Sequence, residues 1–260
     1  MQTLADMGEH ISAIYERNDV KIRELEGMEE YKGFWAGAGL RTDLSGVTEI
    51  TENGIKYTVD YINGQKTGFF LDQKYNRQAI RRIAEGRTVL DCFTHTGSFA
   101  LNAAAAGAKS VTAVDISADA IEMTRHNAEQ NGFTNVEFRQ ADVFDLLTEL
   151  YRAGGHPYDF IILDPPAFTK SSSTVRAAER GYKEINLKAM RLLPRGGYLA
   201  TCSCSHFMTE TLFRHMLHDA AADAGVSLRQ IEARRQAPDH PILWNVPETD
   251  YLKFYIFQVV

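Results

Sequence analysis

The sequence has little cysteine and no long apolar run. Three cysteines in 260 residues are too few for a disulfide framework, and an odd number suits free thiols in a reducing compartment. No stretch approaches the ~20 apolar residues of a membrane-spanning helix. The start, from Met1 to Asp6, lacks the basic and apolar regions of a signal peptide. We therefore expect a cytoplasmic protein with free thiols.

Positive charge is also scarce, because 28 basic residues face 34 acidic ones and the net charge is -6. Binding to a nucleic-acid backbone is largely electrostatic, so this balance counts against RNA as a partner unless a local basic face exists. The composition, 44% hydrophobic and 24% charged, excludes disordered and collagen-like classes. The length suits one large α/β domain with a small appendage.

Residues 1–72 are predicted to form the appendage. The segment from about Leu4 to Glu26 is expected to be helical and then strand-like. Residues 56–62 alternate and are rich in β-branched side chains, which is typical of a strand. Asn63 and Gly64 tolerate positive φ and predict a hairpin turn, with residues 66–71 as the returning strand.

Residues 73–260 are predicted to form a Rossmann-like α/β domain. A helical period begins at residue 73, and strands and helices then alternate. Strands are expected at 88–91, 110–115, 136–139, 158–163 and 197–202, and helices at 98–106, 118–131, 143–151, 176–193 and 212–224. Such alternation predicts a parallel sheet with right-handed crossovers and helices on both faces. The tail, 251–260, is expected to add an antiparallel strand at the sheet edge.

Polar residues stand where the predicted strands end, which is where open α/β sheets bind ligands. The turn from Asp91 to Gly97 offers a close backbone approach and the free N–H groups of a helix start. It lacks the three glycines of the dinucleotide motif, which disfavours a nicotinamide cofactor. Asp115, about 20 residues later, is placed to bind a ribose, and Ser117 could cap the following helix in its stead. Asp142 is equally compatible with binding an adenine amine and with an N-cap.

The segment from Asp164 to Phe168 contains two consecutive prolines, Pro165 and Pro166. Prolines stiffen a strand exit and continue neither a ladder nor a helix. Asp164 could accept from the amine of a flipped base, and Phe168 could stack on it. The plainer interpretation is a rigid turn with a core phenylalanine.

Cys202, Cys204 and His206 alternate at the end of another buried strand. They lack a second cluster with zinc spacing, so we predict no metal. Buried cysteines are usually inert, whereas a thiol at a strand end beside a base pocket is a candidate nucleophile.

With these residues, the chain resembles the RlmI-type class I methyltransferases, which make 5-methylcytosine in large-subunit ribosomal RNA. The matching segments are 63–73, 91–97, 164–168, 180–186, 203–205 and 235–241. The resemblance implies a seven-stranded sheet with a reversed last hairpin, S-adenosylmethionine as cofactor, ribosomal RNA as partner and Cys204 as nucleophile. Members carry an N-terminal RNA-binding domain of the PUA type, for which this chain has no room before Leu4.

The resemblance also implies that Lys66, Thr67, Asp72, Gln73 and Arg77 close over the cofactor. The full set of predicted cofactor-binding residues is Lys66, Thr67, Asp72, Gln73, Arg77, Asp91, Phe93, Thr94, Gly97, Asp115, Ile116, Asp142, Val143 and Asp164. Those predicted to bind the substrate are Pro165, Pro166, Phe168 and His240. No membrane partner is expected, and a homodimer is left open.

The predicted reaction begins when Cys204 adds to carbon 6 of cytosine and makes carbon 5 nucleophilic, while Asp164 binds the base edge. The sequence does not identify the base that removes the carbon 5 proton, and Asp239 and His240 are the candidates. The competing interpretations are methylation of a guanine nitrogen, which needs no thiol, and a non-catalytic module that retains the cofactor pocket.

Overall fold

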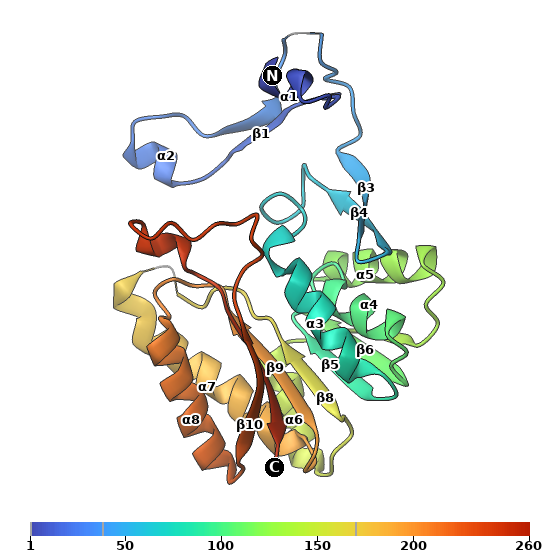
Figure 1. Ribbon diagram of the computed structural model, residues 1–260, viewed down its shortest axis with the longest axis vertical. Coiled ribbons are helices and arrows are strands. Elements are labelled where there is room, and N and C mark those ends of the chain that lie inside the picture. The colour runs from blue at the N-terminus through green and yellow to red at the C-terminus, as the bar shows by residue number, and fades with distance from the viewer. Residues whose placement is uncertain (1, 38, 170) are drawn as a thin grey trace. The chain divides into compact units, whose positions relative to one another are not determined.

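The computed structural model describes residues 2–37, 39–169 and 171–260, and the chain divides into two compact units (Figure 1). The first unit comprises Met1–Ile50 and Tyr57–Phe70, and the second comprises Thr51–Lys56 and Leu71–Val260. The predicted boundary after residue 72 stays a prediction.

The first unit contains short elements. The helices α1 (Gln2–Asp6) and α2 (Ile22–Leu25) accompany the strands β1 (Tyr15–Asn18) and β2 (Tyr31–Phe34). The two strands pair antiparallel. Tyr15 lies 4.9 Å from Phe34 and 5.8 Å from Tyr61 between ring centroids, in edge-to-face geometry. Arg17 donates to the carbonyl oxygens of Tyr61 and Gly64, so this small unit is held by an aromatic cluster and one arginine.

The predicted hairpin around Asn63-Gly64 is wrong. The strand β4 (Ile55–Asp60) pairs with β3 (Val47–Glu52), which precedes it in the chain. The turn between them is Asn53-Gly54, where φ is 53° and 77°, as a type I′ turn requires. Residues 61–68 instead form successive turns, because the Asp60 carboxylate accepts from the N–H groups of Ile62 and Asn63 and bends the chain away from strand geometry.

The second unit is built on a seven-stranded sheet in the order β10-β11-β9-β8-β5-β6-β7. Five neighbouring strands are parallel, and β11 alone runs the other way. The strands are β5 (Thr88–Cys92), β6 (Ser110–Asp115), β7 (Val136–Gln140), β8 (Phe160–Leu163), β9 (Tyr198–Ser203), β10 (Leu228–Arg234) and β11 (Lys253–Val259). The Rossmann-like α/β fold predicted from the alternation is confirmed.

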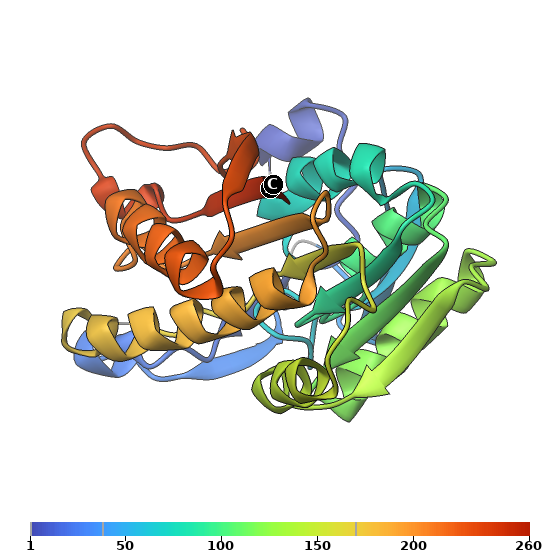
Figure 2. The ribbon, with the colours of Figure 1, turned by 90° about the horizontal axis from the view of Figure 1, so that it is seen from below.

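Helices cover both faces of this sheet (Figure 2). The helices α3 (Lys74–Ala84), α4 (Ser98–Ala105) and α5 (Ala118–Gln130) form one set, and α6 (Val143–Ala153), α7 (Val175–Leu192) and α8 (Glu210–Ala224) form the other. Short 3-10 turns lie at Leu71–Gln73, Ser172–Thr174 and Pro247–Thr249. The α7 face predicted from three-four spacing is buried, with Tyr182, Ile185 and Ala189 fully inaccessible.

The tail strand is antiparallel as predicted, but its predicted place at the sheet edge is wrong. β11 lies between β9 and β10, and β10 is the edge strand. Phe254 and Ile256 of β11 are fully buried, which suits a central strand, whereas β10 is partly or fully exposed along its length. The apolar composition of the tail is therefore explained by burial between two neighbours.

Candidate functional site

Three of the predicted site residues lie at the carboxyl ends of neighbouring strands of the sheet. Asp91 is in β5, Asp164 follows β8 and Cys204 follows β9, and these three strands are neighbours that run parallel. Their carboxyl ends therefore meet, which is where ligands of open α/β sheets bind. Asp115 ends β6, the next strand along.

The turn after β5 has an unusual backbone. Phe93 and His95 adopt positive φ, at 65° and 53°, and Gly97 lies at 83° as the N-cap of α4. Left-handed conformations cost free energy in residues with a Cβ and cluster at functional sites. The turn is held because Thr124 donates to the His95 carbonyl oxygen. A Cβ at Gly97 would lie 2.6 Å from Thr124 Cγ2, so only glycine fits there.

Asp91 is fully buried. Its Oδ2 accepts from Thr94 Oγ1 at 2.6 Å and from the Ala100 N–H at 2.9 Å. Its Oδ1 is buried and has no hydrogen-bond partner among the described residues. Desolvation, with a smaller contribution from the charge of Asp164, raises the pKa of Asp91 to about 7. A buried acceptor without a donor invites a ligand that brings one.

Asp115 and Asp142 lie at the ends of β6 and β7. Asp115 accepts from the N–H groups of His95 and Ser117, each at 3.0 Å, and Ser117 caps α5, as its position predicted. Asp142 caps α6 through Oδ1, which accepts from Phe144 N at 2.8 Å. Of the residues that follow these two acids, Ile116 is 64% exposed and Val143 is buried. The cap does not decide between the two interpretations of Asp142.

The carboxylate of Asp164 is joined to the 3-10 turn Leu71–Gln73 and to β9. Gln73 Nε2 donates to Asp164 Oδ1 at 3.1 Å, and Cys202 Sγ donates to the same oxygen at 2.9 Å. Desolvation raises the pKa of Asp164 to about 6, although these two donors and the charge of Arg77 oppose it. Burial and the nearby Asp164 charge raise the pKa of the Cys202 thiol well above its usual range, so this thiol is poorly suited to attack.

Cys204 has a different environment, although it lies only two residues further on. It is partly exposed, whereas Cys202 and Cys92 are buried. The residues on both sides of it are fixed, because Ser203 Oγ donates to Tyr182 OH at 3.0 Å and Ser205 Oγ donates to the Thr169 carbonyl oxygen at 2.9 Å. The segment after β9 is therefore tied to α7 and to the proline-containing turn after β8.

The proline-containing turn presents one exposed and one buried ring. Pro166 is exposed, Pro165 is buried and Phe168 is partly buried. The Phe168 ring lies 4.6 Å from Tyr182, 5.8 Å from Phe144 and 6.4 Å from Phe93 between centroids. Phe168 thus belongs to an aromatic cluster, and its predicted contact with a substrate stays a prediction.

Arg77 and Asp72 are engaged by protein groups. The buried Arg77 guanidinium binds both Glu52 carboxylate oxygens, at 2.6 and 2.8 Å, and Glu52 is 8% exposed. Asp72 Oδ2 accepts from Tyr251 OH at 2.7 Å, while Oδ1 is buried without a hydrogen-bond partner among the described residues. The structure therefore gives Arg77 a structural role in this unit, and its predicted contact with the cofactor stays a prediction.

Lys66 and Thr67 belong to the first unit. Lys66 has a φ of 51°, and its Nζ lies 5.2 Å from the centroid of the Phe70 ring. Thr67 Oγ1 donates to the Phe69 carbonyl oxygen at 3.3 Å. Their predicted closure over the cofactor stays a prediction.

His240 lies in the loop between β10 and β11. Its Nδ1 is 2.9 Å from Asp239 Oδ1, and its N–H donates to the Ala237 carbonyl oxygen at 2.8 Å. Asp239 also pairs with Lys74, and the Lys74 and His240 side chains lower the pKa of Asp239. A low pKa makes Asp239 a weak proton acceptor.

One buried cation near Cys204 was missed at the sequence level. Lys253, the first residue of β11, is 3% exposed. Its Nζ donates to the carbonyl oxygens of Ser205 and Tyr251 at 2.6 and 2.8 Å. The available signal was a single lysine inside the apolar tail, since lysine is rarely buried without a reason.

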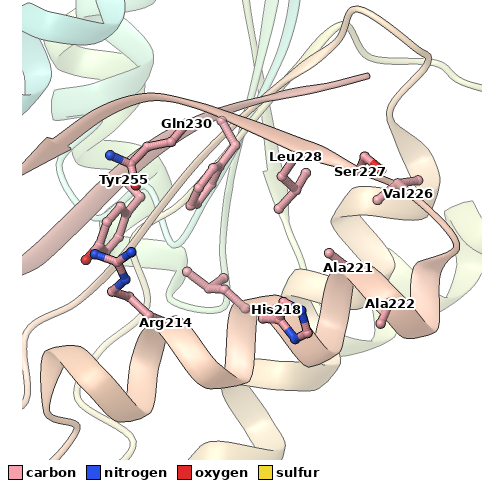
Figure 3. Close-up of a pocket in the computed structure, with 11 residues that line it drawn as sticks. Arg214, His218, Ala221, Ala222, Val226, Ser227, Leu228, Gln230 and Tyr255 are labelled. Atoms are coloured by element: carbon pink, nitrogen blue, oxygen red, sulfur yellow. The ribbon is translucent and has the colours of Figure 1, made fainter.

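A cavity of about 440 Å³ lies elsewhere, between α8 and the strands β10 and β11 (Figure 3). Ser227 and Leu228, which line it, precede and begin β10, so the cavity lies toward the amino ends of the parallel strands. None of the predicted site residues lines it. Shared opening of Cys204 and Asp164 into one cavity stays a prediction.

Within the part of the chain that the structure describes, no cluster of three or more His, Cys, Asp or Glu residues could hold a metal ion. In the same residues no helix has both the length and the apolar character needed to cross a membrane.

Comparisons with known proteins identify the family to which the chain belongs. A family model described as S-adenosylmethionine-dependent methyltransferase matches residues 18–257. A ribosomal RNA large subunit methyltransferase I from Aeromonas salmonicida is 47% identical over 243 residues, which are 93% of this chain and 60% of that protein. The protein of that name from Erwinia tasmaniensis is 45% identical, over 95% of this chain and 62% of its own length. The chain thus spans about 60% of the length of these curated relatives.

Among solved structures, a protein from Streptococcus mutans described as a SAM-dependent methyltransferase superposes with a TM-score of 0.76. The two chains are 25% identical, and the superposition covers 88% of this chain and 58% of that one.

The residues present fit S-adenosylmethionine, which carries a sulfonium, an ammonium and a ribose diol. Asp91, Asp115 and Asp164 supply negative charge at one sheet edge, and the charges of Asp164 and Asp115 each raise the pKa of Asp91. Such a field favours a cationic ligand. The unpartnered Asp91 Oδ1 could accept from the ammonium, and Asp115 stands where an acid binds a ribose.

Proposed function

Since the chain belongs to the S-adenosylmethionine-dependent methyltransferase family, we propose that it methylates carbon 5 of a cytosine in large-subunit ribosomal RNA through a covalent adduct of Cys204 at carbon 6. The observation that carries this proposal is the partly exposed thiol after β9, on the strand next to the one that Asp164 follows. The names of the relatives support ribosomal RNA as substrate. The chain covers only part of those relatives, so the activity of the whole protein is part of the proposal.

The thiol supports the choice of atom. Carbon 5 of cytosine is a weak nucleophile, and methylation at a guanine nitrogen would need no cysteine. When the Cys204 thiolate adds to carbon 6, an S–C bond forms and the electron pair of the ring double bond moves to carbon 5. With the donor bound, the electron pair on carbon 5 would form the bond to the methyl group while the methyl–sulfur bond of the donor breaks and its sulfur keeps that electron pair. A base then removes the proton from carbon 5, and the thiolate leaves as the double bond re-forms.

The three cysteines differ in their fitness for this step. Cys202 is buried, donates to Asp164 and has a raised pKa. Cys92 is also buried, and desolvation raises its pKa well above the usual range. Cys204 alone combines partial exposure with a position at the carboxyl end of a strand.

Asp164 is proposed to bind the edge of the cytosine. Its Oδ1 already accepts from Gln73 and Cys202, which orients the carboxyl group. With a pKa raised to about 6, it is largely ionised at neutral pH and can accept from the exocyclic amine of cytosine. Pro166, which is exposed, and Phe168 are proposed to pack on the face of the base.

The cofactor, when bound, supplies an electrophilic methyl group. We propose that Asp91 and Asp115 hold its ammonium and its ribose, and that Asp142 reaches its adenine amine. Ile116, exposed beyond β6, offers an apolar contact to the adenine ring. The backbone of the turn from Phe93 to Gly97 gives close approach to the ligand.

The test is transfer of a tritiated methyl group to ribosomal RNA, naked and assembled into subunits, followed by nucleoside analysis. The wild type should yield 5-methylcytosine. Cys204→Ala should lose at least about a hundredfold in rate, because the covalent route is removed, and should still bind the cofactor by calorimetry. Cys92→Ala, which also removes one cysteine, is the matched control and should stay active.

Three outcomes would overturn the proposal. A Cys204→Ala variant that methylates at the wild-type rate would exclude covalent catalysis by this thiol. A product mapped to a guanine nitrogen would exclude cytosine, and cofactor binding without any labelled RNA would point to a non-catalytic module.

A further inference from the structure

Lys253 is a buried cation held next to the Cys204 segment. In the register of β11 and β9, Lys253 lies opposite Ser203, and its Nζ donates to the Ser205 carbonyl oxygen at 2.6 Å. Cys204 is the residue between these two contacts. Its place beside Lys253 is therefore fixed by one strand pairing and one side-chain hydrogen bond.

The ammonium of Lys253 is not neutralised by a close carboxylate. Both of its hydrogen bonds go to carbonyl oxygens, and among the described residues no carboxylate lies within 4.0 Å of its Nζ. Burial to 3% exposure makes the charged form of this lysine costly, so the charged groups around it decide how far its pKa falls.

The charged groups that face Lys253 come from helix α8 and from the segment that connects β10 to β11. Glu210 of α8 and Asp250 of the loop before β11 raise its pKa, and Arg235 of the loop after β10 lowers it. Arg235 forms ion pairs with both Glu210 and Asp250, so it offsets one of these two negative charges and leaves the other to favour the ammonium. Together with burial, which has the largest effect, they leave the pKa of Lys253 lowered to about 8.

Cys204 is a further ionisable neighbour of Lys253, and its charge also raises the pKa of Cys202, Tyr182 and Tyr251. When ionised, it raises the pKa of Lys253, and after burial it is the largest influence on that group. The attraction is mutual, so a protonated Lys253 must favour the thiolate form of Cys204. The effect on Cys202 is the opposite, because the neighbouring carboxylate of Asp164 raises the pKa of its thiol.

We propose that Lys253 is a positioning residue that holds Cys204 as a thiolate and thereby sets its nucleophilicity. The ammonium acts through space on the sulfur and through the Ser205 carbonyl on the backbone that carries it. This deepens the proposed function and rests on it, since a reactive thiolate matters only where Cys204 attacks a substrate.

Alkylation of Cys204 by iodoacetamide tests this proposal without RNA or cofactor. The rate is measured by mass spectrometry of the peptide that contains Cys204, across pH 5 to 10, in the full chain. In the wild type the rate should reach half its maximum below pH ~8.5, the value for a free cysteine. A midpoint at or above that value would overturn the proposal, and this arm needs no variant.

Lys253→Met keeps the length of the side chain and removes its charge. The midpoint should rise by about one pH unit, which is about a tenfold slower alkylation at pH 7. Lys253→Arg should keep the midpoint near that of the wild type, and Lys188→Met, at a half-buried lysine on α7, is the matched control. A Lys253→Met protein that keeps its fold by circular dichroism and has the wild-type profile would exclude the proposal.

The outcomes separate this inference from the proposed function. If Lys253→Met shifts the alkylation profile while Cys204→Ala still methylates RNA, the coupling stands and the covalent mechanism fails. If Cys204→Ala is inactive while Lys253→Met has the alkylation profile of the wild type, the mechanism stands and the positioning role fails.

Discussion

Replacement of Asp91 by asparagine should stabilise the ligand-free protein at alkaline pH. The fold buries this carboxyl group completely and leaves its Oδ1 without a hydrogen-bond partner among the described residues. Asparagine keeps one oxygen that can accept from Thr94 and Ala100, as Asp91 does now, and it carries no charge. The variant therefore removes the electrostatic cost and keeps most of the local contacts.

The magnitude follows from the raised pKa. The pKa of Asp91 rises from 3.8 to about 7, so the folded state favours the protonated form. Its contribution to stability is full below pH ~4 and is lost as the pH rises through about 7. Between pH 5 and 8 the wild type should lose roughly 2 to 3 kcal/mol through this group, whereas the variant should not.

The assay is urea unfolding of both proteins at pH 5, 6, 7 and 8, with the difference in unfolding free energy plotted against pH. The difference should move in favour of Asp91→Asn by roughly 2 to 3 kcal/mol across this range. Asp119→Asn, at an exposed carboxylate in the first turn of α5, controls for the change of carboxylate to amide. S-adenosylhomocysteine at saturation should stabilise the wild type more than the variant, because binding to the folded state adds to stability.

Parallel curves for the wild type and Asp91→Asn would refute the reasoning. Such a result would mean that water or a relaxed backbone solvates the carboxylate of Asp91. An Asp91→Asn variant could also gain stability at high pH and still bind the ligand as tightly as the wild type. The electrostatic cost would then be real, and Asp91 would not hold the ammonium.

The remaining predictions concern a buried ion pair and a glycine. Arg77→Met should lower the unfolding free energy by about 3 to 5 kcal/mol, because it leaves Glu52 charged and buried, and the double variant with Glu52→Leu should recover much of that loss in thermal unfolding. An Arg77→Met protein as stable as the wild type would contradict this. Gly97→Ala should lower the unfolding free energy more than Gly225→Ala, because both glycines have positive φ but only a Cβ at Gly97 meets a side chain. Equal losses in urea unfolding would show that backbone strain alone accounts for the effect.

Much of the fold follows from the sequence because its patterns are local. The alternation of apolar runs and three-four spacings predicted β5 to β9 and α4 to α8 within a few residues at each end. The strand-end polar residues were predicted to share one edge because parallel strands end together. Asp91, Asp164 and Cys204 do follow three neighbouring strands.

The strand pairings and side-chain contacts that were not predicted join residues that compete for partners or lie far apart in the sequence. Two Asn-Gly pairs could each turn a hairpin, and the pairing of β4 with β3 uses the first of them. The strand β10 was not predicted because its sequence alternates charged residues at a sheet edge. The contact of Gln73 with Asp164 joins residues 91 apart, and that of Lys253 with Ser205 joins residues 48 apart, so neither leaves a local pattern.

At the end of the chain the order of strands in sequence differs from their order in the sheet, and this has a consequence for how the protein folds during synthesis. The ribosome makes β10 before β11, yet β11 separates β10 from β9. Until β11 inserts, the hydrogen-bonding edge of β9 stays open and prone to pair wrongly. The ammonium of Lys253 is brought into place by the same insertion. The thiol of Cys204 would therefore stay unreactive until β11 has paired with β9.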